Sequence, residues 1–247
     1  AFYIEPDWVR LRQYTLTTEK LPPGTNIRIA HITDLHITDF GKRERRMIDL
    51  TKAARPDIIV LTGDYRGSWS SEAMEALKQA AEELSVIAPV YAVRGNWDSS
   101  NDDMLLRVSG VKVHRGWKKI SLDNNIDLAL GEMDWPGHTS LQPVPEDLKI
   151  MYKILLCHVP YKIHMAEDQR VDLFLVGHTH GGQVRLPVFG ALLPNRRLVG
   201  KYQAGFYKEG DTLMYVNRGI GSESENAPKV RLFCRPEVAV FEIIGKK

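Results

Sequence analysis

The side chains that could do chemistry in this chain are carboxylates, a carboxamide and imidazoles that occur in short strings. Each string follows a run of apolar and β-branched residues typical of a buried strand, and the runs cover residues 27–33, 57–62, 89–94, 153–157 and 171–176. The sheet of an α/β protein gathers its functional side chains at strand ends, so we expect one shared site. The strings are Asp34-x-His36, Gly63-Asp64, Gly95-Asn96-Trp97-Asp98, His158 after Cys157, and Gly177-His178-Thr179-His180.

Two of the strings have a spacing that suits a metal ion. In an extended chain, residues i and i+2 point to the same side, so Asp34 and His36 can hold a single ion. His178 and His180 repeat this spacing at another strand end. Oxygen and nitrogen donors without thiolates suit Mn²⁺, Fe or Zn²⁺ and disfavour an all-oxygen Ca²⁺ site.

The remaining strings supply the rest of a ligand set. Asp64 suits a bridge between two ions because its carboxylate has two oxygens and a full negative charge. Asn96 offers a neutral carbonyl oxygen, and His158 completes the set. Taken alone, each string has an ordinary structural interpretation, such as a helix cap or a turn. Their common position after strands favours a site for two metal ions.

The elements that must position these strings indicate an α/β domain. The first part of the chain alternates strand, helix, strand, helix and strand, which predicts a parallel sheet with right-handed crossovers. One helix is expected within residues 41–57, where Pro56 ends it. The next is expected over residues 72–87, with Ser70 or Ser71 as its N-cap.

The second part of the chain is richer in strands. Residues 111–117, 118–124 and 126–133 predict a meander, and a helix or loop is expected over residues 141–149. A short helical stretch is expected between the strand runs that end at Cys157 and begin at Val171. This pattern favours two packed sheets with helices outside.

Length and composition agree with a single domain over residues 1–247. Hydrophobic residues make up 43% and charged residues 26%, as expected for a globular core, and no apolar run is long enough to span a bilayer. The net charge of +2 without a concentrated basic stripe argues against nucleic acid as a partner. Residues 1–24 predict an N-terminal strand and turn, before which a leader or anchor could have been removed, since the chain begins with Ala1.

The order of the strings resembles the calcineurin-like metallophosphoesterases over residues 27–184, and residues 177–187 and 217–238 are similar to the bacterial branch of that family. The resemblance implies a four-layer α/β/β/α sandwich of two mixed sheets with a dinuclear metal site at the strand ends. It also implies two divalent ions, with Mn²⁺ expected before Fe or Zn²⁺. It assigns one ion to Asp34, His36, Asp64 and His180, and the other to Asp64, Asn96, His158 and His178.

The implied activity is hydrolysis of a phosphodiester or pyrophosphate bond by a hydroxide held between the two ions. We expect Asp64, Asn96, Asp98 and Arg66 to take part in catalysis. Arg66 could hold a substrate phosphate, and the alternative is an ordinary surface arginine. The other functions considered are a phosphomonoesterase or protein phosphatase of the same family, or a non-catalytic metal-binding scaffold.

Trp97 departs from the family motif Gly-Asn-His-Asp/Glu, whose His stabilises the transition state or protonates the leaving group. Indole does not titrate near neutrality and cannot act as a general acid. Its presence favours a good leaving group, as in a nucleotide-diphosphate sugar, and the chain resembles the UDP-diacylglucosamine pyrophosphohydrolases. Alternatively, Trp97 only packs, and an acid comes from His31, His138 or His164.

The residues after the first string are basic. Positive charge at a helix N-terminus is unfavourable for the helix dipole, which leaves two interpretations: a solvated helix face, or contact with an anionic substrate or lipid headgroup. On the second interpretation we expect a phosphorylated small molecule or lipid as substrate, with peripheral membrane contact. A bacterial protein, cytoplasmic or held at a membrane, fits this interpretation. The basic residues are Lys42, Arg43, Arg45 and Arg46.

Overall fold

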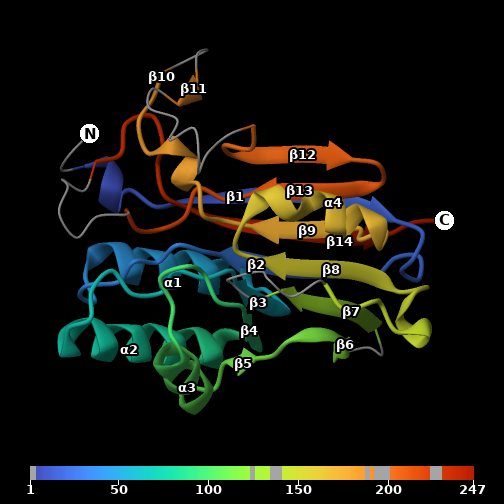
Figure 1. The fold of residues 1–247 in the computed structure, drawn as a ribbon, viewed down its shortest axis with the longest axis horizontal. Coiled ribbons are helices and arrows are strands. Elements are labelled where there is room, and N and C mark those ends of the chain that lie inside the picture. The colour runs from blue at the N-terminus through green and yellow to red at the C-terminus, as the bar shows by residue number, and fades with distance from the viewer. Residues whose placement is uncertain (1–3, 123–125, 134–140, 187–189, 192–200, 223–229) are drawn as a thin grey trace.

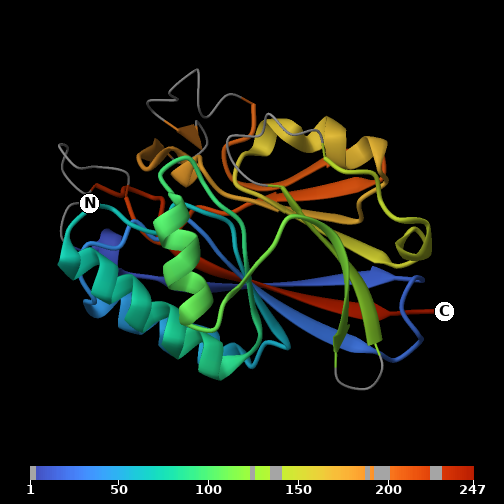
Figure 2. The ribbon, with the colours of Figure 1, turned by 60° about the horizontal axis from the view of Figure 1, so that its bottom comes forward.

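Two six-stranded sheets pack face to face, and helices cover their outer faces (Figures 1 and 2). Figure 2 shows α1 (Lys42–Ala54) and α2 (Ser71–Ile87) on one outer side and α4 (Ile163–Asp168) on the other. The expected α/β/β/α sandwich of two mixed sheets is therefore confirmed. The computed structural model describes residues 4–122, 126–133, 141–186, 190–191, 201–222 and 230–247.

The first sheet joins both ends of the chain to the βαβ units. Strands β2 to β5 run parallel, β14 is antiparallel to β2, and β1 is parallel to β14. Helices α1 and α2 are the crossovers between β2, β3 and β4, as the sequence predicts. The order across the sheet is β1 (Arg10–Thr18), β14 (Glu237–Gly245), β2 (Asn26–Ile32), β3 (Ile58–Leu61), β4 (Val90–Ala92) and β5 (Lys112–Val113).

The helix ends follow local capping chemistry. Arg55, in the left-handed conformation, follows the last residue of α1 just before Pro56. The hydroxyl of Ser70 accepts a hydrogen bond of 3.1 Å from the backbone N–H of Ala73, which makes Ser70 rather than Ser71 the N-cap of α2. Helix α3 (Ser100–Val108) was not predicted from the sequence, and it is only nine residues long.

The second sheet is also mixed. Strands β13, β9, β8 and β7 are parallel, and β12 and β6 are antiparallel edge strands. The order is β12 (Gly205–Glu209), β13 (Thr212–Val216), β9 (Leu173–Val176), β8 (Tyr152–Cys157), β7 (Ile126–Met133) and β6 (Gly116–Leu122).

The predicted meander over residues 111–133 is wrong in its first strand. Strand β5 belongs to the first sheet, and the chain crosses to the second sheet before β6. Gly116 makes this turn with a φ of +78°, a conformation that costs glycine little. Only β6 and β7 therefore form the expected antiparallel pair.

Several shorter elements complete the described chain. Residues 141–149, expected as helix or loop, contain only a 3₁₀ helix at Glu146–Leu148. None of the helices in the described ranges has the length and apolar character needed to cross a bilayer. Further 3₁₀ helices lie at Glu5–Asp7, Pro160–Lys162 and His180–Gly182, and β10 (Arg185–Leu186) pairs with β11 (Gly190–Ala191).

One apolar core lies between the two sheets, and another lies between the first sheet and helices α1 and α2. In β8, Ile154 and Leu156 face the core between the sheets, while Leu155 and Cys157 face the layer that contains α4. Both faces of the central strands are covered, which explains why these segments have continuous apolar sequences rather than alternating ones. Polar side chains are consequently displaced to the strand ends, where the candidate site lies.

Candidate metal centre

The structure brings the predicted strand-end residues into two adjacent groups of buried donors. In the first group, His36 Nε2 lies 3.2 Å from His180 Nε2. His180 Nε2 lies 3.4 Å from Asp34 Oδ1. These three residues come from the loops after β2 and β9, so the group joins the two sheets.

The second group lies around His158. Its Nε2 atom is 3.2 Å from Asp64 Oδ2 and 3.1 Å from His178 Nδ1. Asn96 Oδ1 is 3.0 Å from the same nitrogen. Asp64 Oδ2 also lies 3.6 Å from His36 Nε2, so this carboxylate reaches both groups. The residues that the family resemblance assigns to each ion therefore lie close together, and their role as ligands stays a prediction.

The backbone at these strand ends is held in an unusual conformation. A positive φ costs a residue with a side chain roughly 1 kcal/mol or more, and such strain clusters at functional sites. The candidate ligands with a positive φ are Asp34 (49°), His36 (40°), Asp64 (58°), His178 (73°) and His180 (47°).

Glycines allow the strand-end loops to approach each other closely. A Cβ on Gly63 would lie 2.3 Å from the backbone nitrogen of Gly95. A Cβ on Gly177 would lie 2.2 Å from Asp34 Oδ2. The glycine that precedes each of these aspartate and histidine strings is therefore required by packing.

Asp98 organises the loops that carry Asp64 and Asn96. Its carboxylate accepts hydrogen bonds from the backbone N–H groups of Asp64 (2.7 Å), Tyr65 (2.8 Å) and Gly95 (2.6 Å). It is a backbone clamp and holds the candidate bridging residue in place. The sequence suggested a catalytic role for Asp98. In the structure its carboxylate bonds to three backbone N–H groups, which is a positioning role.

Hydrogen bonds also orient the individual ligands. His158 Nδ1 donates to the carbonyl oxygen of Thr62 at 2.7 Å, so Nε2 is the ring nitrogen that faces the site and could ligate a metal. Both carboxylate oxygens of Asp34 accept from the backbone N–H of His178, at 3.1 and 3.0 Å, and Oδ2 also accepts from the Thr33 hydroxyl.

The segment after β13 supports the site and was not identified as functional from the sequence. The backbone N–H of Gly221 donates to the Asp34 carbonyl oxygen at 2.7 Å. The fully buried guanidinium of Arg231 donates to carbonyl oxygens of Arg218, Gly221 and Cys234. The only signal in the sequence was the similarity of residues 217–238 to the bacterial branch of the family.

The charge balance of the second group favours a cation. His158 Nε2 faces oxygen atoms of Asp64 and Asn96 and a nitrogen of His178, all of them potential acceptors. Burial lowers the pKa of His158, but Asp64, Asp34 and the hydrogen bond to Thr62 together raise it to about 10. Burial raises the pKa of Asp64, yet His158 holds it well below its ordinary value. A divalent cation would supply the same positive charge, so the residues fit a metal.

The other imidazoles are suited to ligation because they are neutral. Burial lowers the pKa of His36 to about 4, and burial together with His158 lowers that of His178 to about 4. The pKa of His180 is lowered further, mainly by burial. Burial and the neighbouring Asp64 raise the pKa of Asp34 to about 7. The three imidazoles therefore present lone pairs at neutral pH.

Trp97 borders the donor groups. Its ring meets that of His36 edge-on, with centroids 5.9 Å apart, and its backbone N–H donates to Asp64 Oδ1 at 2.9 Å. His31 is buried in β2 against the Thr62 hydroxyl, and His164 is exposed on α4. His138 lies outside the described residues. Within the described residues, neither His31 nor His164 makes a hydrogen bond or ring contact with a candidate ligand.

Arg66 and the basic residues of α1 are largely engaged by other protein groups. The buried Arg66 guanidinium pairs with Asp102 and stacks on the Trp69 ring at 4.5 Å. Arg43 is buried in an ion pair with Glu44, at 2.6 Å. Arg45 lies over the Phe40 ring, 5.1 Å from its centroid.

Buried carboxylates and imidazoles at the strand ends of an α/β/β/α sandwich define a metal-dependent hydrolase of the phosphoesterase class. A family model described as "Calcineurin-like phosphoesterase" matches residues 27–182. The chain belongs to this family, which confirms the resemblance found in the sequence and the expectation of an enzyme.

Curated relatives match almost the whole chain. It is 29% identical to an uncharacterized metallophosphoesterase, YkuE, of Bacillus subtilis, with 98% of this chain and 88% of the relative covered. It is 30% identical to the phosphodiesterase YaeI of Escherichia coli, with 98% and 91% covered. NAD nucleotidase of Haemophilus influenzae shares the fold, with a TM-score of 0.51 and 14% identity over 81% of this chain and 46% of that chain.

Proposed function

We propose that this chain is a dinuclear metal-dependent phosphohydrolase that cleaves a phosphodiester or pyrophosphate bond. The observation that carries the proposal is the position of Asp64, whose Oδ2 atom lies 3.6 Å from His36 Nε2 and 3.2 Å from His158 Nε2. One carboxylate thus serves two groups of donors. Two divalent ions held there would activate water and neutralise the charge of a phosphate group.

The chain's own residues hold and orient the site in this proposal. Asp34, His36 and His180 would hold one ion, Asn96, His158 and His178 would hold the other, and Asp64 would be shared. Asp98 keeps the loops of Asp64 and Asn96 at a fixed separation through its backbone hydrogen bonds. Pre-positioning of this kind reduces the reorganisation needed in the transition state.

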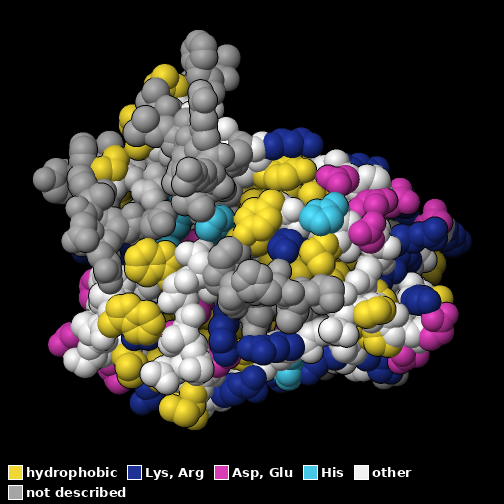
Figure 3. All heavy atoms as spheres, viewed as in Figure 1, with side chains coloured by type: hydrophobic (Ala, Val, Ile, Leu, Met, Phe, Trp, Pro, Cys, Tyr) yellow, Lys and Arg dark blue, Asp and Glu magenta, His cyan; other side chains and the backbone are white. Residues whose placement is uncertain are grey.

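A basic surface beside the site supports an anionic substrate. Gly116, the first residue of β6, pairs with Glu132 of β7, which in turn pairs with Leu156 of β8. Leu156 is two residues before His158. The start of β6 therefore lies level with the candidate ligands. Burial and then the charges of Lys118, Arg107 and Lys112 lower the pKa of His114 there. Figure 3 shows Lys and Arg side chains gathered on this part of the face, below exposed histidines.

The tryptophan at position 97 supports a narrower class of substrate. The Trp97 indole does not titrate near neutrality, and both carboxylate oxygens of Asp98 accept hydrogen bonds from backbone N–H groups, which favours a bond whose leaving group needs no protonation. We propose a phosphoanhydride such as that of a UDP-diacylglucosamine-like nucleotide-sugar lipid, or a phosphodiester, as the name of the relative YaeI suggests. A lipid substrate would bring the protein to a membrane surface.

Metal reconstitution with a chromogenic substrate tests this function. Metal-free protein should gain turnover of bis(p-nitrophenyl) phosphate as Mn²⁺ is added, with a smaller gain for Fe²⁺ or Zn²⁺. Asp64→Asn should abolish turnover and weaken binding of both ions. Tight metal binding without turnover of any phosphoester would instead favour a scaffold. Faster hydrolysis of p-nitrophenyl phosphate than of the diester would favour a phosphomonoesterase or protein phosphatase.

A further inference from the structure

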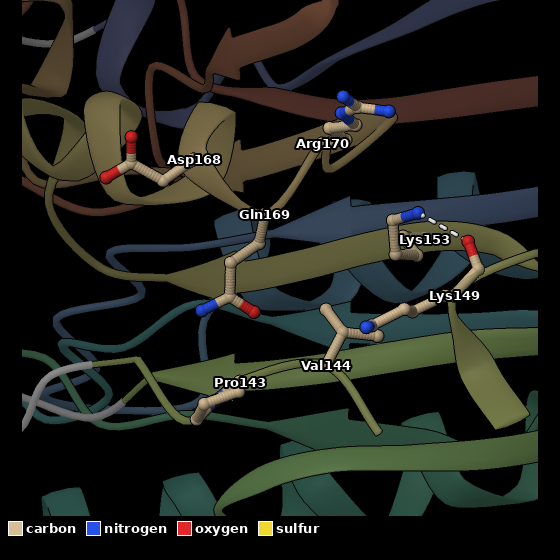
Figure 4. Close-up of a pocket in the computed structure, with 7 residues that line it drawn as sticks. All are labelled: Pro143, Val144, Lys149, Lys153, Asp168, Gln169 and Arg170. Carbon is tan, nitrogen blue, oxygen red and sulfur yellow. Dashed lines mark hydrogen bonds between the residues drawn. The ribbon is translucent and has the colours of Figure 1, made fainter. Parts of the chain in front are cut away.

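A cavity lies on the outer face of the second sheet, away from the candidate metal centre. Its volume is about 550 Å³, and its described lining comes from residues 143–149, the start of β8 and the turn between α4 and β9. Lys153 on β8 is five residues before His158, which corresponds to about 17 Å along a strand. The lining residues are Pro143, Val144, Lys149, Lys153, Asp168, Gln169 and Arg170 (Figure 4).

The walls of this cavity are held in place by hydrogen bonds. The Trp117 indole N–H donates to the Gln142 carbonyl oxygen at 2.9 Å and to Gln169 Oε1 at 3.2 Å. The Gln169 amide in turn donates to the Leu141 carbonyl oxygen at 3.2 Å. These bonds tie the segment after β7 to the end of α4, so the cavity is preformed, as small-molecule sites usually are.

Positive charge dominates the polar part of the lining. Lys153 is only 4% exposed, and its ammonium donates to the neutral carbonyl oxygen of Lys149 at 2.9 Å. Burial, Lys20 and Arg170 lower the pKa of Lys153, with Asp172 opposing them. In Figure 4 the Lys149 ammonium lies over Val144, and the Asp168 carboxylate points away from the lysines. A buried ammonium with three donors is poorly satisfied by one carbonyl oxygen.

Arg170 occupies a backbone position that favours glycine. Its φ is +52°, and the N–H of Val171 donates to the Ala166 carbonyl oxygen at 3.0 Å, the bond that closes a Schellman motif. Within the described part of the chain, the Arg170 side chain forms no ion pair or hydrogen bond. An arginine is therefore present where local stability favours glycine, and its guanidinium is available to the cavity.

We propose that this cavity binds a small organic anion, with its oxyanion group against Lys149, Lys153 and Arg170 and its apolar part against Pro143 and Val144. The cavity volume falls in the usual range for a small-molecule site. Lys149 also pairs with Glu146 at 2.5 Å, so Lys153 and Arg170 carry most of the unpaired charge. This site is separate from the phosphoesterase centre and requires no catalysis.

Naphthalene-2-sulfonate is a suitable probe, because sulfonates are weak metal ligands and the ring supplies the apolar part. Fluorescence titration of the metal-loaded protein should show saturable binding at one site, and the neutral analogue 2-naphthalenemethanol should bind at least about tenfold more weakly. Lys153→Met and Arg170→Gly should each weaken sulfonate binding by about tenfold or more.

Arg55→Gly is the matched control, since Arg55 is also an exposed arginine with a positive φ (48°) after a helix. Both glycine variants should keep or raise the melting temperature, but only Arg170→Gly should lose affinity for the sulfonate. Phosphodiester turnover should remain unchanged in all three variants, which separates this test from that of the proposed function. Wild-type affinity in Lys153→Met or Arg170→Gly, equal binding of the neutral analogue, or an equal loss in Arg55→Gly would overturn the proposal.

Discussion

Asp98 accepts the backbone N–H of Asp64 at 2.7 Å, although the two residues are 34 positions apart in the chain. The same carboxylate accepts from Tyr65 and Gly95, so it joins the loops after β3 and β4. Asp64 Oδ1 in turn accepts a hydrogen bond from the backbone N–H of Trp97. The Asp at the end of the Gly-Asn-x-Asp string therefore acts on the geometry of the candidate bridging ligand, whether or not a histidine precedes it.

Asp98→Asn should weaken metal binding by about 10–100-fold, with turnover falling in parallel. An amide presents an NH₂ group toward one of the three backbone N–H donors, which opens the link between the two loops. Isothermal titration with Mn²⁺ measures the change. Asp211→Asn, at an exposed position in the turn between β12 and β13, is the control and should bind as the wild type does. Unchanged metal affinity in Asp98→Asn would remove the positioning role.

Trp97→His should speed hydrolysis of an alkyl phosphodiester by about tenfold or more relative to a pyrophosphate substrate. An imidazole next to His36 can protonate an alkoxide leaving group, whereas an anhydride gains little from protonation. Trp97→Phe keeps an aromatic ring without a donor and should leave the ratio unchanged. Comparison of kcat/KM for the two substrates provides the measurement, and equal acceleration of both would contradict the proposed link between Trp97 and the leaving group.

Arg66→Met should lower the free energy of unfolding by about 3–5 kcal/mol, because it leaves the buried Asp102 carboxylate without its cation. Arg66→Lys should cost less, since it keeps the charge but loses the planar contact with Trp69. Denaturant unfolding measures both variants. If KM rises strongly while stability is retained, then Arg66 holds substrate phosphate, as the sequence suggested.

His31 should make the protein more sensitive to acid. Burial lowers its pKa to about 3, against an ordinary value of 6.5, so only the unfolded state takes up this proton between those values. The contribution of the neutral His31 to the free energy of unfolding is therefore fully present above pH 6.5. Below that pH it falls by about 1.4 kcal/mol per pH unit. Between pH 6.5 and 5, wild type should lose about 2 kcal/mol more than His31→Gln in denaturant unfolding. Protonation of the candidate metal ligands and loss of metal affect wild type and His31→Gln alike, so they cancel in this comparison. Equal decreases in the free energy of unfolding would refute the prediction.

The sequence determined much of the fold because its strongest signals are local. Continuous apolar runs mark strands buried on both faces, and Pro56 and Ser70 mark helix ends through their own backbone chemistry. The candidate ligands were also recognisable, since their residue types and strand-end positions are visible without a structure. The short helix α3 and the separation of β5 from β6 were not, because short elements depend on contacts from distant segments.

Only the tertiary structure decided which groups act on one another. Asp64 reaches both donor groups because β3 and β8 end at the same edge of two facing sheets, which no spacing in the sequence encodes. The pairing of Arg66 with Asp102 and the burial of Lys153 beside a cavity likewise arise from packing between remote segments. Residue types determine what chemistry is available, whereas burial and neighbouring charges set the protonation and exposure of each group.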